Sequence, residues 1–573
     1  MSKLLYRHLA IIIFQEFLLC KETSIDALPA AIFLDSNLEE FLEFSRNYSL
    51  TAANVLLPSG NSVEMSEFQK SLTESLLHMK QQRNQHPDLF GVTDNGEMDK
   101  PKSLLDALYE MGAIPPYSFP INVVSAYITD ASGKLVYQPE RGLDTAISEY
   151  APGRSIVVDK QTYQIGGFFS PGSERRNGQA SSPARSYMND GNYVKSLLTC
   201  SCGWFGIHDS SLKTCPFCGN RVELHPRKML RPWGLAPRDA GPIPEAQLTE
   251  EYSIAQQPIY STLPDADKMR QVPNTVNMRI ASLSGQRIIL LNQGPSNQGF
   301  VVCKDCGAAM PGKDRSVLKE VGRPYKSKFT KGMCRHSEVE NINIGYDFVT
   351  DMVVLEFSMD RALLDVENSE GIWLNRASQS LAEALRLAAC KELDVDFSEL
   401  VTGYRYRKNA AGVFIDIYLY DSLSSGAGYS VRVAEDIQAI LEGTEALLLQ
   451  CDCESACYRC LKHYRNQWIH GRLDRYAALE LLNWGMKGKI MPSIPHSEQR
   501  DLCLPLQQIL SLSGIEIVDE KDGLILRTQR KEKRIVVYPA MRSEPKKPNT
   551  VFVSDVYLKY AKPYAMQKIL DNL

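Results

Sequence analysis

The sequence predicts an α+β protein made of several domains, and three observations lead to this fold class. A chain of 573 residues is long enough for about three to five domains of ordinary size. Segments with helical spacing of apolar residues alternate with short runs of β-branched and aromatic residues. All but three of the 14 cysteines fall into tight clusters, which is typical of domains that are stabilised by a metal; the exceptions are Cys20, Cys390 and Cys503.

Composition and charge exclude several classes of protein. With 44% hydrophobic and 23% charged residues the chain can bury large cores, so it is neither disordered nor fibrous. The net charge of −4 gives no overall basic field for nucleic acid or membrane, so any basic surface must be local. The apolar run 9–14 is too short for a signal-peptide core or a membrane span. We therefore expect a cytoplasmic protein whose lone cysteines are small buried hydrophobic residues.

Residues 1–100 are expected to form a helical N-terminal region. Apolar residues recur there at helical spacing, as in Phe68, Leu72 and Leu76, and the region ends in the polar stretch 94–97.

Residues 101–198 are expected to form a small β-rich domain. A helix that starts at Leu104 should end at Gly112, because the proline-rich stretch that follows enforces extended backbone. Strands are predicted after it, in three β-branched and aromatic segments that turn signals separate: 123–128, 156–158 and 163–169.

Residues 199–345 carry the first two cysteine clusters, as insertions that resemble zinc ribbons. Between the clusters lies a proline-rich stretch that predicts a stiff connector, with Pro226, Pro232, Pro237, Pro242 and Pro244.

The last two expected domains are a zinc-binding α/β domain at 346–490 and a small α/β domain at 491–573. The first should contain strands at 352–357 and 413–420, an amphipathic helix at about 374–390 and a helix at 473–484. The second carries four short apolar runs that predict strands: 515–518, 524–526, 535–538 and 551–553.

Two of the cysteine clusters lie in the third expected domain. The first has the pattern CxC followed by CxxCG, and it offers four thiolates from Cys200, Cys202, Cys215 and Cys218. Zinc prefers four soft ligands in a tetrahedron, which two short turns can supply. The second offers three sulfurs and one nitrogen from Cys303, Cys306, Cys334 and His336. We expect structural zinc in both, although a long spacer separates the two halves of the second cluster.

A basic segment with aromatic residues lies within the second cluster. Phosphate attraction and base stacking need such residues, so we predict nucleic-acid contacts from Tyr325, Lys326, Lys328, Lys331 and Arg335. The alternative interpretation is an ordinary solvated face of the protein.

The third cluster is the densest, with four thiols in ten residues: Cys451, Cys453, Cys457 and Cys460. Four thiolates form a closed site, which favours structural zinc over hydrolytic zinc, and an iron–sulfur cluster is the alternative. The following segment 462–475 combines cations with aromatic residues, so Arg465 and Trp468 are candidate nucleic-acid contacts. The alternative is that these cations form salt bridges that clamp the neighbouring helix.

The third cluster and its flanks resemble a known family. They resemble the MrfA-type zinc-binding domain, which lies at the C-terminal end of certain superfamily-two DNA helicases. The residues that carry the resemblance are Asp421, the turn 425–428, the four cysteines, Asn466, His470 and the run 473–475. The upstream segments 104–120 and 149–159 resemble the part of those helicases that links motor and zinc domain, so the likeness covers about 104–485. Ala456 and Tyr458 depart from the usual glycine and proline of the family.

The resemblance implies a role in bacterial anti-phage defence. Phosphate-loop, DEAD-box, GxSxG, HExxH and GxGxxG motifs are absent from the sequence. The nearest arrangement is the DISARM system, in which a DrmB-like subunit with this domain works with the helicase DrmA. We therefore predict a non-enzymatic zinc-binding subunit, with two to three structural zinc ions, that joins a separate DrmA-like DNA helicase and helps it to bind and load on DNA.

Two other functions remain open at this point. The first is a metal-dependent nuclease that uses the carboxylates of the C-terminal domain, Asp519, Asp522 and Glu532. The second is a scaffold whose zinc clusters serve only to bind partner proteins.

Overall fold

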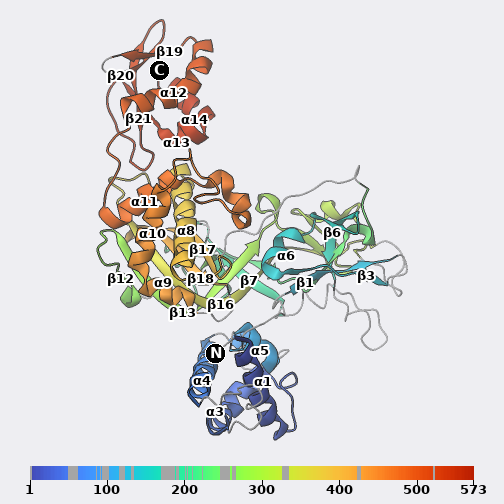
Figure 1. Cartoon of the computed structure of the whole chain (residues 1–573). Helices are drawn as coiled ribbons and strands as arrows, with labels where there is room; N and C mark the ends of the chain where they lie inside the picture. The colour runs from blue at the N-terminus through green and yellow to red at the C-terminus, as the bar shows by residue number, and fades with distance from the viewer. Residues whose placement is uncertain are drawn as a thin grey trace. The chain divides into compact units, whose positions relative to one another are not determined.

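The computed structural model describes most of the chain in two compact units. The described residues are 3–48, 62–85, 87–90, 92, 102–111, 113–114, 123–130, 134–169, 188, 191, 193–200, 202, 204–209, 211–221, 223–244, 259–260, 266–324, 334–422, 428–520 and 523–573. Unit 1 comprises 1–262, 285–350 and 423–427, and unit 2 comprises 263–284, 351–422 and 428–573. Helices at the N-terminus and several sheets confirm the predicted α+β class (Figure 1). The three cysteine-rich clusters agree with it.

Unit 1 begins with a group of helices that share one apolar core. They are α1 (Lys3–Leu19), α2 (Ala30–Ile32), α3 (Leu38–Asn47), α4 (Ser62–Gln85) and α5 (Leu104–Glu110). Three fully buried rings form the centre, where Phe14 stacks on Phe41 at 4.2 Å and Phe33 packs edge-on against Phe41. Aromatic pairs of this kind add stability beyond the area that they bury.

The next part of unit 1 is a five-stranded sheet with the order β4-β1-β10-β6-β5. Its strands are β1 (Val123–Ala126), β4 (Glu140–Gly142), β5 (Ser155–Val158), β6 (Gln161–Phe168) and β10 (Gly234–Pro237). A separate hairpin pairs β2 (Ile128–Thr129) with β3 (Leu135–Tyr137), and α6 (Leu143–Glu149) packs on the sheet.

The prediction of a stiff proline-rich connector is wrong, because this stretch supplies two strands. β9 (Glu223–Leu230) pairs with β7 (Val194–Thr199), and β10 pairs with β1 and β6. The prolines are tolerated because the ladders are irregular there: the β7–β9 register shifts between Leu197 and Thr199, opposite the part of β9 that contains Pro226. The β10–β6 register shifts at Pro237. A missing N–H costs least at such irregular positions.

A second, larger set of strands contributes to both units. In unit 1, β7 lies between β9 and β8 (Phe205–Ile207). In the same unit β11 (Ile259–Tyr260) pairs with β13 (Met278–Asn292). A third group places β14 (Phe300–Cys303) between β15 (Ala309–Pro311) and β16 (Val339–Met359). In unit 2, β18 (Gly412–Asp421) lies between β17 (Leu400–Asn409) and the second half of β16, and β12 (Arg270–Gln271) pairs with the first half of β13.

Helices cover the sheet of unit 2 and form its main core. They are α8 (Ile372–Glu392), α9 (Tyr429–Glu435), α10 (Ile437–Leu449) and α11 (Arg475–Lys487). The central helix α8 contacts α10, α11, β17 and β18, and Leu381 and Leu385 of its apolar face are fully buried. The core also contains Cys451 and Cys460, so the third cysteine cluster is part of this packing.

The end of unit 2 is a small α/β domain with a core of its own. Its sheet has the order β19-β20-β21-β22, with β19 (Glu516–Glu520), β20 (Gly523–Arg527), β21 (Glu532–Tyr538) and β22 (Thr550–Ser554). Three helices accompany it, α12 (His496–Leu512), α13 (Asp555–Tyr560) and α14 (Lys562–Asp571). Only β21 and β22 run parallel to each other.

Among the described residues, none of the helices has the length and the apolar character that crossing a membrane requires. The finer division of the chain into five domains stays a prediction.

The close approach of α11 to β16 leads to a first prediction. A methyl group at Gly485 would lie 2.5 Å from the ring of Phe357 and 2.7 Å from Met278, whereas one at Gly443 in α10 would lie 3.8 Å from its nearest neighbour. We expect Gly485→Ala to lower the free energy of unfolding by about 1–3 kcal/mol through overpacking. The matched helical control Gly443→Ala should raise it by roughly 0.5–1 kcal/mol. Thermal unfolding followed by circular dichroism measures both; equal melting temperatures for the two variants would contradict this packing.

Candidate metal centres and nucleic-acid interface

The first cysteine cluster brings its four thiols together. The Sγ atoms of Cys200 and Cys218 are 3.5 Å apart, and those of Cys202 and Cys215 are 3.6 Å apart. Cys215 and Cys218 sit on a turn that Gly219 completes with a positive φ of 74°, a conformation that glycine adopts without strain. All four ligand atoms lie within 4.8 Å of one another, so the spacing of the motif predicts the geometry correctly.

The second cluster also converges, across the long spacer. Cys303 Sγ lies 3.8 Å from Cys334 Sγ, and Cys306 Sγ lies 3.6 Å from Nδ1 of His336. Nε2 of His336 donates to the backbone oxygen of Val321 at 2.8 Å, since a carbonyl can only accept. This hydrogen bond leaves the Nδ1 lone pair free for a metal, which is the usual arrangement of a histidine ligand.

The third cluster is formed by a short loop between α10 and α11. Its Sγ–Sγ distances are 3.4 Å for Cys451 and Cys457, 3.7 Å for Cys453 and Cys460, and 3.8 Å for Cys457 and Cys460. The backbone N–H of Cys457 points at Cys460 Sγ from 3.1 Å, and the N–H of Arg459 points at Cys457 Sγ from 3.4 Å. Such hydrogen bonds to sulfur favour the thiolate form that metals bind.

The three donor sets fit zinc. A disulfide needs about 2.05 Å between sulfurs, which none of these pairs approaches. Four ligands at the zinc–sulfur bond length of about 2.3 Å, in a tetrahedron, lie about 3.8 Å apart, and a sulfur–nitrogen pair lies about 3.6 Å apart. The observed distances of 3.4–3.8 Å agree with these values. The clusters therefore support structural zinc ions, with no ligand position left open for a reaction.

The local environment makes some of these thiols acidic. The backbone N–H of Arg459 is the main reason that the pKa of Cys457 is lowered to about 6. The neighbouring thiol Cys202 lowers the pKa of Cys215 to about 5, and Cys306 does the same for Cys303. Each cluster thus holds one thiol that is deprotonated at neutral pH and ready to bind a cation.

Arg475 ties the loop of the third cluster to α11. Its buried guanidinium donates to the backbone oxygens of Cys453 at 3.2 Å and Leu448 at 3.0 Å, and its own N–H donates to Ser455 at 2.9 Å. Buried backbone carbonyls near a cluster need such donors, because water does not reach them. Arg475 therefore supports the fold of the loop and is not available to a ligand.

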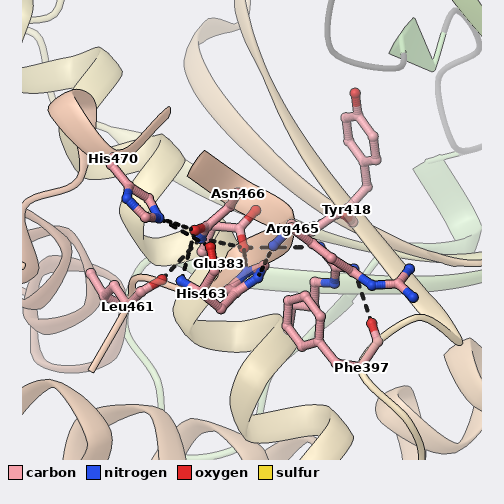
Figure 2. A network of polar contacts seen from close by, with 10 residues as sticks. Glu383, Phe397, Tyr418, Leu461, His463, Arg465, Asn466 and His470 are labelled. Atoms are coloured by element: carbon pink, nitrogen blue, oxygen red, sulfur yellow. Dashed lines mark hydrogen bonds and ion pairs between the residues drawn. The ribbon is translucent and has the colours of Figure 1, made fainter. Parts of the chain in front are cut away.

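A polar network holds the segment that follows the third cluster (Figure 2). Asn466 lies at its centre and uses all its hydrogen-bonding groups: Nδ2 donates to Leu461 O and to Glu383 Oε2, and Oδ1 accepts from the N–H of His463 and from His470. Nε2 of His463 donates to Glu383 at 3.2 Å, while its Nδ1 accepts from the N–H of Arg465 at 3.1 Å. The buried carboxylate of Glu383 thus links α8 to the segment Tyr464–Arg472.

The structure places the predicted nucleic-acid residues in different situations. Arg465 and Trp468 are exposed on the segment Tyr464–Arg472, and Arg335 is exposed beside the second cluster. Tyr325, Lys326, Lys328 and Lys331 lie outside the described residues.

The two carboxylates of the nuclease alternative that the structure describes each pair with a basic side chain. Asp519 pairs with His496 at 2.7 Å and Glu532 pairs with Arg527, while Asp522 lies outside the described residues. Within the described part of the chain, the groups with metal-type ligands are the three cysteine clusters.

The lone cysteines differ from the prediction at one position. Cys390 and Cys503 are buried as expected, but Cys20 is exposed, because it follows the last turn of α1, where its Sγ donates to the backbone oxygen of Glu16. The prediction that Cys20 is buried is therefore wrong.

Sequence reasoning missed Glu383 and gave His463 no role. The signal that could have found Glu383 is its place in α8, where it lies between the buried residues Leu381 and Leu385. A carboxylate among buried positions needs a partner, and His463, Asn466 and Arg386 supply it.

The geometry of the third cluster belongs to a known class of domain. Residues 381–461 match the model of the MrfA Zn-binding domain, so this part of the chain is such a domain. The match ends just after the last of the four cysteines and begins in α8, near Glu383.

Comparison of whole chains finds one curated relative and several solved structures. The chain is 29% identical to Druantia protein DruE of Escherichia coli (strain UMEA 4076-1) over 496 residues, which are 81% of this chain and 26% of that protein. This chain therefore spans about a quarter of the length of that relative. A crystal structure of the DUF1998 helicase MrfA bound to DNA overlaps 72% of this chain and 43% of the helicase, with 12% identity and a TM-score of 0.32. The structure of MrfA with DNA and AMPPNP gives 11% identity and a TM-score of 0.25 over 71% of this chain and 44% of the helicase.

These comparisons contradict the prediction that the chain is not an enzyme. The proteins to which it is similar are Druantia protein DruE and the helicase MrfA, which was solved with DNA and AMPPNP. The prediction relied on the absence of ATP-binding motifs from this sequence. A motif search of this kind tests only the residues of this chain.

The donor geometry leads to a prediction about metal content. We expect the purified chain to hold three zinc ions, one for each cluster, and Cys457→Ser to hold one fewer, because three ligands bind zinc more weakly than four. Cys20→Ser, which removes an exposed thiol outside the clusters, is the matched control and should change nothing. Metal analysis of the purified proteins measures this. The assignment would be contradicted if the Cys20 variant lost zinc, or if the Cys457 variant held as much zinc as the wild type.

A second prediction concerns pH. The lowered pKa of Cys457, about 6, means that its thiolate is present above this pH and is lost as the pH falls through it. Because zinc must compete with protons for all four thiolates, we expect zinc to stay bound at neutral pH and to be released as the pH falls and protons displace it. A colorimetric zinc chelator during acid titration follows the release. Release that starts well above neutral pH would contradict the expectation.

Proposed function

We propose that this chain is a zinc-binding, DNA-contacting part of a helicase-related anti-phage defence protein of the bacterial cytoplasm. The similarity to Druantia protein DruE over 81% of the chain carries this proposal. The MrfA Zn-binding domain at 381–461 supports it, since the expectation of a defence role rests on that domain.

The proposed task of the chain is to hold DNA next to a helicase motor and to help load the motor. Two places supply contacts: the exposed residues Arg465 and Trp468 after the third cluster, and the basic segment with Tyr325, Lys326, Lys328, Lys331 and Arg335. Cations attract phosphates through counterion release, and aromatic rings stack on bases. Structural zinc would keep the segment after the third cluster in shape, because that segment adjoins the four cysteines.

The motor could act from the same polypeptide or from a separate one. A DISARM-like arrangement, in which a DrmB-like protein works with a DrmA-like helicase, is the version with a separate motor. Affinity purification of the natively expressed protein decides between them: a motor on the same polypeptide gives one band with ATPase activity, and a separate motor gives a second, co-purifying helicase. Recovery without any ATPase would contradict a helicase-related function.

A genetic experiment tests the defence role. We expect Cys457→Ser in the intact locus to reduce protection against phage by an order of magnitude or more, because the zinc-binding loop would lose its fourth ligand and its shape. Cys20→Ser should protect like the wild type. Plaque counts on cells that carry each variant measure the effect, and full protection by the Cys457 variant would contradict the proposal.

Charge reversal tests the basic segment. Changing Lys326, Lys328 and Lys331 to Glu should weaken DNA binding and flatten the dependence of the binding constant on salt, because each phosphate contact releases counterions. Zinc content and melting temperature should stay the same. Anisotropy titrations at several salt concentrations give the slope; an unchanged slope would refute these contacts and favour the scaffold interpretation.

A further inference from the structure

Three large aromatic side chains near the third cluster are exposed to solvent. Tyr458, Tyr464 and Trp468 are 72%, 83% and 64% exposed, although rings of this size usually bury most of their surface. The ring of Tyr458 touches the ring of His470 edge-on at 5.4 Å, which brings the cluster loop next to the segment Tyr464–Arg472. Tyr464 and Trp468 belong to that segment, so all three exposed rings lie on the cluster loop or on the segment that it touches. Exposed apolar patches mark interaction sites.

The backbone beneath these rings is firmly held. Asn466 and Ile469, which alternate with the exposed residues, are buried, and Asn466 makes the hydrogen bonds of the network around Glu383 (Figure 2). His463 also caps the segment, since its Nδ1 accepts from Arg465 while Asn466 accepts from the N–H of His463. A surface that is ordered before binding costs less entropy when a ligand arrives.

Glu383 has its own support on the side of α8. Arg386 lies 3.9 Å from the Glu383 carboxylate, donates to the backbone oxygen of Phe397 at 2.9 Å and stacks on the Phe397 ring at 3.6 Å. The Phe397 ring in turn packs against the ring of His463 at 4.1 Å. Glu383, Arg386, Phe397 and His463 thus form a closed ring of contacts. Arg386 holds the Glu383 carboxylate on the side of α8, and this carboxylate in turn holds His463 and Asn466.

The charges around the rings favour an anionic ligand. Three exposed arginines lie close in sequence to the rings, Arg459, Arg465 and Arg472, against the exposed carboxylates of Asp452 and Glu454. The surface is therefore net positive and aromatic. Phosphates and exposed base faces together match it, whereas an acidic peptide would leave the rings without a stacking partner.

We propose that Tyr458, Tyr464 and Trp468 form a stacking surface for unpaired bases of single-stranded DNA, and that Glu383 is the residue that positions this surface. The inference rests on the proposed DNA-contacting function and names the form of DNA. Stacking on a side chain needs a base face that is free, and in duplex DNA both faces are covered by neighbouring base pairs. Single strands are therefore preferred over duplexes at this surface.

Binding of the full chain to a labelled oligothymidine and to a duplex of equal length tests the proposal. Replacing Tyr464 and Trp468 together by alanine should weaken single-strand binding about tenfold or more, as expected for lost base stacking. Duplex binding should change less than about twofold, because phosphate contacts remain. Tyr564→Ala in α14, which removes another exposed tyrosine that lies outside this surface, is the control.

The outcomes separate the inference from the function on which it rests. If the wild-type chain binds neither form of DNA, the DNA-contacting function fails. If it binds DNA but the double variant loses single strand and duplex equally, or loses nothing, the stacking surface fails while the function stands.

A second variant tests the role of Glu383. Glu383→Ala removes the carboxylate oxygen Oε2, which accepts hydrogen bonds from both His463 and Asn466. We expect the ratio of single-strand to duplex affinity to fall several-fold with zinc content unchanged. A lower melting temperature with the same ratio would show that Glu383 only stabilises the fold. His470→Ala, which removes one bond to Asn466, serves if the Glu383 variant does not fold, and an unchanged ratio there would overturn the positioning role.

Discussion

The convergence of four metal ligands at each of three places is the constraint on which this structure depends. Each cluster joins two short stretches of chain through four ligands, so a bound ion would add to the packing around it; in the second cluster Cys303 and Cys306 lie in a small core with Leu318. In the third cluster the effect reaches further, because Cys451 and Cys460 also pack into the core of unit 2. The third cluster therefore stabilises several elements together: its own loop, the helices on either side of the loop, and the segment Tyr464–Arg472.

Around that cluster, hydrogen bonds between polar residues hold the segment Tyr464–Arg472 in place, a role that apolar packing usually has. Asn466, His463 and Glu383 satisfy one another in a sheltered place, where an unpaired donor or acceptor would be costly. The result is an exposed segment with a fixed backbone, which a ligand can meet without ordering it first. A positively charged aromatic surface on a rigid base is a familiar solution for holding a polymer of phosphates and rings.

The sequence predicts the ligand sets well because zinc requires particular residue types at short spacing. It predicts α8 and the strands of the C-terminal domain for a similar reason, since their apolar residues follow a clear period. It fails at the prolines of β9 and β10, where irregular pairing accepts a residue that the local rules exclude from strands. It also fails at Glu383, whose role depends on residues some 80 positions away. Such contacts are set by tertiary structure, and no local pattern encodes them.

The second cluster has a topological consequence. Its ligands lie at 303–306 and at 334–336, so a bound zinc ion closes a ring of some thirty residues. A protease that cuts the chain once inside this ring would not separate the two pieces, because the metal would still join them. The nicked protein would keep its apparent size under native conditions, because the ion would join the two pieces in addition to the pairing of β14 with β16. In this sense the ion would act as a reversible crosslink that supports the strand pairing beside it.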